Sequence, residues 1–192
     1  MVLSLTEIAD LAPETIRPLS RLEYDRLVAE GMFEGERVEL LGGVLVAMTP
    51  QYPVHSGVVQ RLNRVLMRAL GSSCDVRVQL PLAVSDDSEP EPDLAVVPLG
   101  DTDDAHPRTA FLVVEVSNAS VAKDRTVKAS LYAAADVPEY WLVNVADGQI
   151  EVHVEPRNGR YGLVAIRRPG ETISLRAFPD VAIAVDDVLR RR

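Results

Sequence analysis

The sequence contains very little cysteine: Cys74 is its single example in 192 residues. An intramolecular disulfide is therefore excluded, and so is a zinc site built from several cysteines. Long apolar runs are absent too, since none approaches the ~20 consecutive residues that a helix needs to cross a bilayer. The first residues include acids where a secretory signal peptide carries a basic region. We therefore expect a cytoplasmic protein with no membrane association.

Positive charge is also scarce. The chain has 20 lysines and arginines against 29 acids, which gives a net charge of −9. Broad, non-specific binding to nucleic acid needs clustered basic residues, so this composition argues against it but leaves a local basic face possible. Residues 86–104 carry many acids and no lysine or arginine. Apart from Asp93, these acids are most simply solvated loop residues.

The length and composition are those of an ordinary globular protein. Hydrophobic residues make up 47% and charged residues 26% of the chain, and its length suffices for one domain with a sizeable core. No repeat, linker or low-complexity segment interrupts it. We expect a single domain over residues 1–192, with an N-terminal arm over residues 1–19.

Three segments have the periodicity of helices. Residues 20–31 begin with the S-x-x-E capping box of Ser20 and Glu23 and carry Leu22, Leu27 and Val28 as a helical stripe. Residues 54–71 place apolar side chains on one face and arginines on the other. Residues 123–136 predict a third helix, with Val127, Leu131 and Ala135 as its apolar stripe.

Most of the remaining apolar segments indicate strands. The segment around Gly42 and Gly43 predicts a hairpin, and short β-branched runs of the kind found in buried central strands follow Asp93 and precede Ser117. Further strands are expected at 74–85, 138–145, 148–156 and 159–168. The predicted class is α+β, with a mixed β-sheet flanked by helices.

Two acids stand in strands that otherwise call for burial. Asp93 opens "DLAVVP", and Glu115 follows four apolar residues in "FLVVEVS". A carboxylate in such a place is costly unless it is paired or binds a metal. If the two strands are neighbours, the acids converge and form a hard-oxygen site suited to Mg²⁺ or Mn²⁺. The alternatives are that Asp93 caps a turn after Pro92 and that Glu115 faces solvent from an edge strand.

The same residues carry a resemblance. Pro92-Asp93 followed by Glu115 resembles the motif of the PD-(D/E)XK nuclease superfamily. Four blocks in order, "RVELLGGVLVAMTP", "EPDLAVV", "LVVEVSNAS" and "DVPEYWLV", resemble the Uma-type restriction endonuclease family over roughly residues 20–145. The resemblance implies a restriction-endonuclease-like fold, with a metal site where two central strands diverge.

The resemblance also implies a set of site residues. Asp93 and Glu115 match the metal-binding acids, but Ser117 stands where the superfamily pattern has its lysine. In the Uma-type family the lysine lies on the following helix, which points to Lys128 rather than to Lys123 at the entrance of that helix. Lysine is useful there because its ammonium group can orient the attacking water and stabilise developing charge.

Two further residues match the family. Glu39 matches an acid of the first hairpin and is expected to be an additional metal or water ligand. His55 matches a histidine at the start of the long helix, with substrate contact or proton transfer as its role. A hydrogen-bonded structural histidine is the alternative for His55.

The implied function is metal-dependent endonucleolytic hydrolysis of DNA. Cutting both strands of a duplex usually takes two active sites, so a homodimer is expected. Two alternatives stay open: a catalytically inactive nucleic-acid-binding or regulatory protein on the same fold, and a nuclease acting on RNA or nucleotides.

Two further groups of residues, one aromatic and one basic, could be structural or could contact nucleic acid. Tyr140 and Trp141 indicate core or dimer-interface aromatics, with base stacking as the alternative. Arg61, Arg64 and Arg68 indicate a solvated helix face, with contact to a DNA backbone as the alternative.

Overall fold

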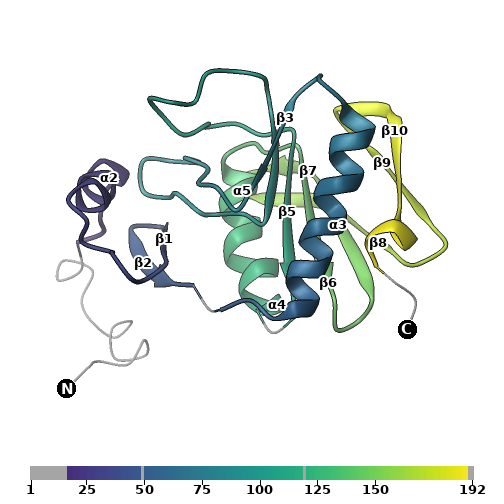
Figure 1. Ribbon diagram of the computed structural model, residues 1–192, viewed down its shortest axis with the longest axis horizontal. Coiled ribbons are helices and arrows are strands. Elements are labelled where there is room, and N and C mark those ends of the chain that lie inside the picture. Colours follow the sequence, from purple (N-terminus) through teal and green to yellow (C-terminus); the bar gives the residue numbers. More distant parts are fainter. Residues whose placement is uncertain (1–16, 49, 119, 190–192) are drawn as a thin grey trace.

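The centre of the protein is a six-stranded sheet. The computed structural model describes residues 17–48, 50–118 and 120–189, so most of the expected arm over residues 1–19 lies outside the described residues. The sheet has the order β3-β4-β5-β6-β7-β8, with β5 and β6 parallel and the other neighbours antiparallel (Figure 1). Its strands are β3 (Asp75–Val78), β4 (Leu94–Val97), β5 (Leu112–Ser117), β6 (Glu139–Asn144), β7 (Gln149–Arg157) and β8 (Arg160–Arg167). The mixed sheet confirms the predicted α+β class.

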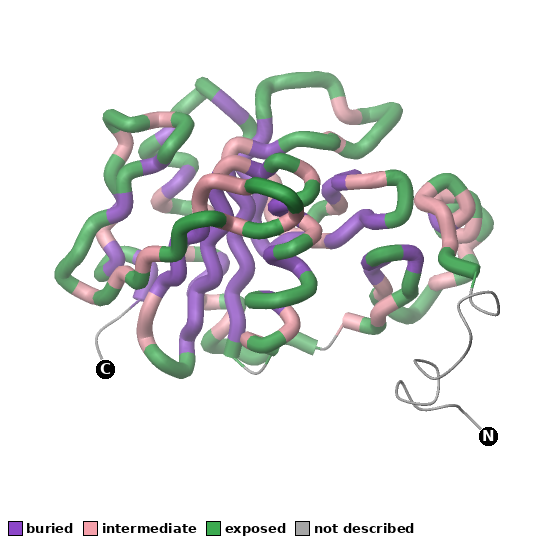
Figure 2. The backbone as a smooth tube through the Cα atoms, turned by 180° about the vertical axis from the view of Figure 1, so that it is seen from behind, coloured by how far each residue is buried: buried purple, intermediate pink, exposed green. Residues whose placement is uncertain are grey.

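The central strands are covered on both faces. Every residue of β4, β5 and β6 is buried, and these strands run through the buried interior in Figure 2. Because side chains alternate across a strand, Val114 and Val116 join one core cluster while Val113 joins the other. Tyr140 and Trp141 are fully buried, which confirms them as core aromatics and removes the base-stacking alternative.

The long helix α3 (Pro53–Leu70) covers the first of these faces. Its C-terminal cap is Gly71, which has a φ of 58° that favours glycine. The helix thus confirms the prediction for residues 54–71. Arg64 and Arg68 are exposed as expected, whereas half-buried Arg61 donates from Nε to the carbonyl of Val188 at 2.8 Å.

The third predicted helix is segmented, and its expected apolar stripe is only partly buried, since Leu131 and Ala135 are half-buried and Val127 is exposed. The segments are α4 (Val121–Lys123), a π-helical turn η2 (Asp124–Lys128) and α5 (Ala129–Ala134). Val127 is 46% exposed, whereas Asp124, Lys128 and Tyr132 are buried. The buried face is partly polar because it packs against a charged pocket, so hydrophobic periodicity missed the polar residues of that face.

A small N-terminal unit lies beside one end of the main sheet (Figure 1). It contains α2 (Arg21–Ala29) and the predicted hairpin of β1 (Val38–Leu41) and β2 (Val44–Ala47). Gly42 and Gly43 both adopt positive φ at the turn of this hairpin, as two-residue hairpin turns require. A bridge between Leu40 and Glu89 ties β1 to the chain segment before β4. The hairpin can therefore bring a side chain of β1 to the end of the sheet.

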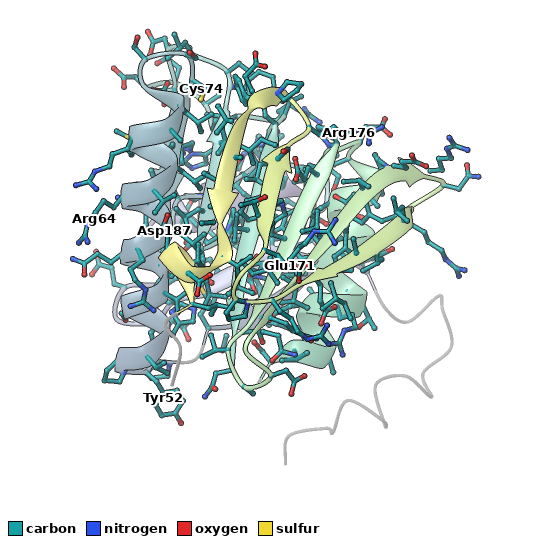
Figure 3. The ribbon with its side chains drawn as sticks, turned by 90° about the vertical axis from the view of Figure 1, so that its right-hand side faces the viewer. Tyr52, Arg64, Cys74, Glu171, Arg176 and Asp187 are labelled. Atoms are coloured by element: carbon teal, nitrogen blue, oxygen red, sulfur yellow. The ribbon has the colours of Figure 1, made fainter. Side chains whose placement is uncertain are left out.

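The hairpin near the C-terminus was not predicted from the sequence. Its strands are β9 (Thr172–Leu175) and β10 (Phe178–Ala184), followed by the short helix α6 (Val185–Val188). Ile173, Leu175 and Ile183 pack in the same core cluster as α3, and Figure 3 shows the hairpin beside that helix. In the described residues, no helix has the length and apolar character of a membrane span.

Candidate active site

The register of β4 and β5 brings the two predicted acids together. Leu94 pairs with Val114 across the antiparallel strands, so Asp93, one residue earlier, lies across from Glu115. The backbone N–H of Val116 donates to Asp93 Oδ2 at 2.8 Å. Both carboxylates are buried, and they lie on the face of the sheet that α5 covers. The convergence expected for neighbouring strands is therefore present.

The Asp93 carboxylate has further donors on both of its oxygens. His55, in the first turn of α3, places Nε2 3.0 Å from Oδ2. Gln79 donates from Nε2 to Oδ1 at 3.2 Å, and its backbone N–H donates to the Asp93 carbonyl at 3.2 Å. Gln79 has a φ of 52°, a conformation that is uncommon for residues other than glycine. The position of Asp93 is thus set by three separate chain segments.

Lys128 lies between two buried acids. Its Nζ is 2.9 Å from Glu39 Oε2 and 3.0 Å from Glu115 Oε1, and the residue is 4% exposed. Lys123 also reaches this group, with Nζ 3.2 Å from Glu39 Oε1. The structure thus places Lys128 as the family resemblance implied, and it brings in Lys123 as well.

The electrostatics of these groups follow from burial and from each other. Burial raises the pKa of Glu115 to about 8; Lys128 opposes the rise, and Asp93 adds to it. Burial acts to lower the pKa of Lys128, but Glu115 and Glu39 outweigh it and hold that pKa above its ordinary value. Lys128 is therefore a cation at neutral pH, and Glu115 is an acid whose ionised form needs a nearby positive charge.

These side chains line one pocket of about 280 Å³. Its acidic and basic lining residues, with histidine included, are Glu39, His55, Glu91, Asp93, Glu115, Lys123, Asp124 and Lys128. All five residues predicted from the sequence line it, although they come from β1, α3, the start of β4, β5 and η2. A larger cavity of about 520 Å³ lies beside α3, and among the described residues its charged lining consists of Arg61 and Asp147. It therefore offers a single carboxylate from the described residues, where the predicted chemistry needs two.

Three residues that line the pocket or bond to its carboxylates escaped the sequence analysis. Asp124 lines the pocket, is buried and accepts a 2.7 Å hydrogen bond from Ser120 Oγ. Tyr132 donates from its hydroxyl to Glu115 Oε1 at 2.7 Å, and Gln79 holds Asp93. The four-residue spacing of Asp124, Lys128 and Tyr132 places them on one helix face, and that spacing was the available signal.

The pocket offers a divalent cation two carboxylates. In residues 17–48, 50–118 and 120–189, no group of three or more His, Cys, Asp and Glu side chains is arranged to hold a metal. Asp93 and Glu115 nevertheless supply the hard oxygen donors that Mg²⁺ and Mn²⁺ prefer, and Mg²⁺ commonly takes one or two carboxylates with water and phosphate oxygens. Glu115 Oε2 accepts no hydrogen bond from the described residues. The donor set therefore fits such an ion.

The architecture is shared with a solved structure. A protein described as "a putative nuclease belonging to DUF820" from Anabaena variabilis ATCC 29413 matches with a TM-score of 0.68 and 13% identity. The match covers 89% of this chain and 97% of that one. The protein thus has a restriction-endonuclease-like nuclease fold.

The sequence defines the family more narrowly. The family model of Uma2, described as "Putative restriction endonuclease", matches residues 22–186, and the chain belongs to that family. The match to the type IIG restriction endonuclease BpuSI covers 63% of this chain and 14% of that chain at 19% identity. Its TM-score of 0.38 is too low to indicate a shared fold. A comparison with curated proteins gave no match.

Proposed function

We propose that this protein is a metal-dependent endonuclease that hydrolyses phosphodiester bonds of DNA. The observation that carries the proposal is the convergence of Glu39, His55, Asp93, Glu115 and Lys128 from five chain segments on one pocket. Membership of the Uma2 family and the nuclease fold support the same chemistry. Burying several acids beside one lysine is costly for a protein that only has to fold, so a functional use of the cluster is favoured.

Asp93 and Glu115 would hold Mg²⁺ or Mn²⁺. A cation in this position would supply the positive charge that activates water and stabilises the leaving oxygen of a phosphodiester. Gln79 and the Val116 N–H fix Asp93, and Tyr132 fixes Glu115. The protein therefore keeps both carboxylates in place before substrate arrives, which is the condition for efficient electrostatic catalysis.

The other predicted residues would handle the water and the phosphate. The Lys128 ammonium would orient the attacking water and offset charge on the phosphate, while Glu39 holds Lys128 from its other side. His55 lies against Asp93 at the start of α3, where it could contact substrate or move a proton. The N-terminal end of α3 carries partial positive charge, which also favours a phosphate at this end of the pocket.

A second candidate is a nucleic-acid-binding protein that does not cleave. The specific observation in its favour is that both oxygens of Asp93 already have protein donors and that Lys128 already bridges Glu39 and Glu115. In this candidate function, the Lys128 ammonium occupies the position of a metal ion and neutralises the acids. The cluster would then be left over from an active nuclease site.

Calorimetric titration with Mn²⁺ separates the two candidates. The wild-type protein should bind Mn²⁺, and Glu115→Gln should abolish binding while circular dichroism shows an unchanged fold. Glu139→Gln is the matched control, because Glu139 is equally buried but lies outside the pocket. No binding by the wild type, or equal binding by wild type and Glu115→Gln, would favour the non-cleaving candidate.

Cleavage is then measured on labelled single-stranded and duplex DNA with Mg²⁺ or Mn²⁺. Glu115→Gln should remove the activity, and chelation of the metal should do the same. The homodimer stays a prediction, and sedimentation equilibrium of the purified protein would test it.

A further inference from the structure

The pocket mouth has an exposed aromatic ring that the proposed chemistry does not use. Tyr52 is 64% exposed and lines the same pocket as the carboxylates. It stands between Pro50 and Pro53 at the N-cap of α3, and its carbonyl accepts from the Ser56 N–H at 3.2 Å. Pro53 directly follows Tyr52 and biases its backbone toward extended conformations, and Tyr52 has a φ of −80° and a ψ of 152°. The backbone that carries this exposed ring beside the pocket is therefore restricted.

The basic residues within the pocket are already committed. Lys128 is paired with Glu39 and Glu115, and Lys123 is paired with Glu39. Any further hold on a phosphate chain has to come from outside the pocket. The surfaces next to the pocket are therefore the places where such phosphate contacts could form.

One of these surfaces is acidic. Glu91 lines the catalytic pocket and also a neighbouring hollow next to α2. That hollow is further lined by Glu30, Glu34 and Glu36, with Arg37 as its basic residue, and Arg37 is paired with Glu91 at 2.7 Å. A second phosphate backbone on this side would meet like charge.

The other surface is formed by the helix α3. The helix α3 contains no aspartate or glutamate over its length. Its exposed stripe, at four-residue spacing from the pocket end, consists of Ser56, Gln60, Arg64 and Arg68. Figure 3 shows Tyr52 at one end of α3 and Arg64 pointing outward further along the same helix. Within the described part of the chain, neither Arg64 nor Arg68 forms an ion pair.

We propose that the substrate is an unpaired DNA strand, with one base stacked on Tyr52 and the adjoining backbone following the Arg64 and Arg68 face of α3. The proposal rests on the proposed nuclease function and names its substrate class. Aromatic rings bind single strands because every base has a face for stacking, and a basic track follows the phosphates. A duplex would place its second strand toward the acidic surface around Glu91. A single active site suffices to cut an unpaired strand, so this substrate does not require a dimer.

The test is fluorescence anisotropy with a short labelled oligonucleotide, either single-stranded or annealed to its complement. Ca²⁺ is present throughout to neutralise the carboxylates. The single strand should bind at least 10-fold more tightly than the duplex. Tyr52→Ala should weaken single-strand binding by about 10-fold, within the range for loss of one stacked base, whereas Tyr52→Phe should bind as the wild type does.

The basic track, which is the Arg64 and Arg68 face of α3, is tested with a separate pair of double variants. Arg64→Glu combined with Arg68→Glu should weaken single-strand binding and reduce its dependence on salt. Arg157→Glu combined with Arg160→Glu is the control, since both arginines are exposed on β7 and β8 and the charge change is equal. An equal loss in the two double variants would show a general charge effect and overturn the track.

Other outcomes would overturn the assignment of substrate. Duplex binding as tight as single-strand binding would do so, and so would wild-type affinity in Tyr52→Ala. Tighter binding to an RNA of the same sequence would overturn the choice of DNA. Failure here is separable from failure of the nuclease function, because Tyr52, Arg64 and Arg68 contact none of the carboxylates and their variants should bind Mn²⁺ as the wild type does.

Discussion

Glu115 and Glu139 lie on adjacent parallel strands and are both at least 95% buried, yet their surroundings differ. Glu139 accepts one hydrogen bond on each oxygen, from Trp141 Nε1 and from the backbone N–H of Arg176, both at 2.7 Å. Glu115 accepts from Lys128 and Tyr132 on a single oxygen and lines a pocket with four other acids. Burial of a carboxylate alone is therefore no sign of a site. The sign is a buried carboxylate with unused acceptor capacity that faces a pocket and other charges.

The largest expected loss of stability comes from removing Lys128, the cation beside Glu115. Lys128→Met leaves Glu39 and Glu115 buried without their shared partner, and should destabilise the protein by about 3–5 kcal/mol. Lys123→Met is the control, because its side chain is 36% exposed and Glu39 keeps Lys128 as its partner in that variant, so the loss should be the smaller of the two. Urea unfolding measures both. Equal losses in the two variants would show that Lys128 is not the principal counter-charge.

The two glutamates should also differ in how they make stability depend on pH. Burial raises the pKa of both, so each binds a proton more readily in the folded than in the unfolded protein. Folding stability then decreases as pH rises from the ordinary carboxyl value of 4.5 through the folded-state pKa, which is about 8 for Glu115. Each group contributes a slope of at most about 1.4 kcal/mol per pH unit.

Glu115→Gln should remove the part of this slope that extends to about pH 8. Glu139→Gln should leave that part in place, since the N–H donors of Arg176 and Trp141 lower the pKa of Glu139 against the effect of burial. Urea unfolding at a series of pH values compares the three proteins. A wild-type slope that survives unchanged in Glu115→Gln would mean that this carboxyl is not the titrating group.

The smallest expected effect concerns Gln79, the amide that holds Asp93. Gln79→Gly removes the side-chain hydrogen bond but tolerates the φ of 52°. Mn²⁺ affinity should fall by about 10-fold, the lower end of the range for groups that orient a metal ligand, with stability within about 1 kcal/mol of wild type. Gln79→Ala would lose the same bond and keep the backbone strain, so it should bind Mn²⁺ equally weakly and be the less stable variant. Unchanged Mn²⁺ affinity in Gln79→Gly would remove Gln79 from the site.

Local patterns in the chain were enough for most of the secondary structure. The helix α3, the β1–β2 hairpin and the strands from β3 to β8 were all expected, because periodicity and turn residues are properties of short segments. The β9–β10 hairpin was missed. Its exposure alternates along β9, but Pro179, Asp180 and a register shift between Phe178 and Ala182 interrupt the pattern in β10.

The sequence by itself determined the α+β class and the strands that carry Asp93 and Glu115, and the family resemblance added Glu39, His55 and Lys128 as candidate site residues. The tertiary structure decided which face of the third predicted helix is buried, and so placed Lys128 between two acids that are far from each other in the chain. It also brought in Gln79, Lys123, Asp124 and Tyr132. Residue type and spacing predict what a segment can form, but the charges that a side chain meets depend on strand register and on packing between distant segments.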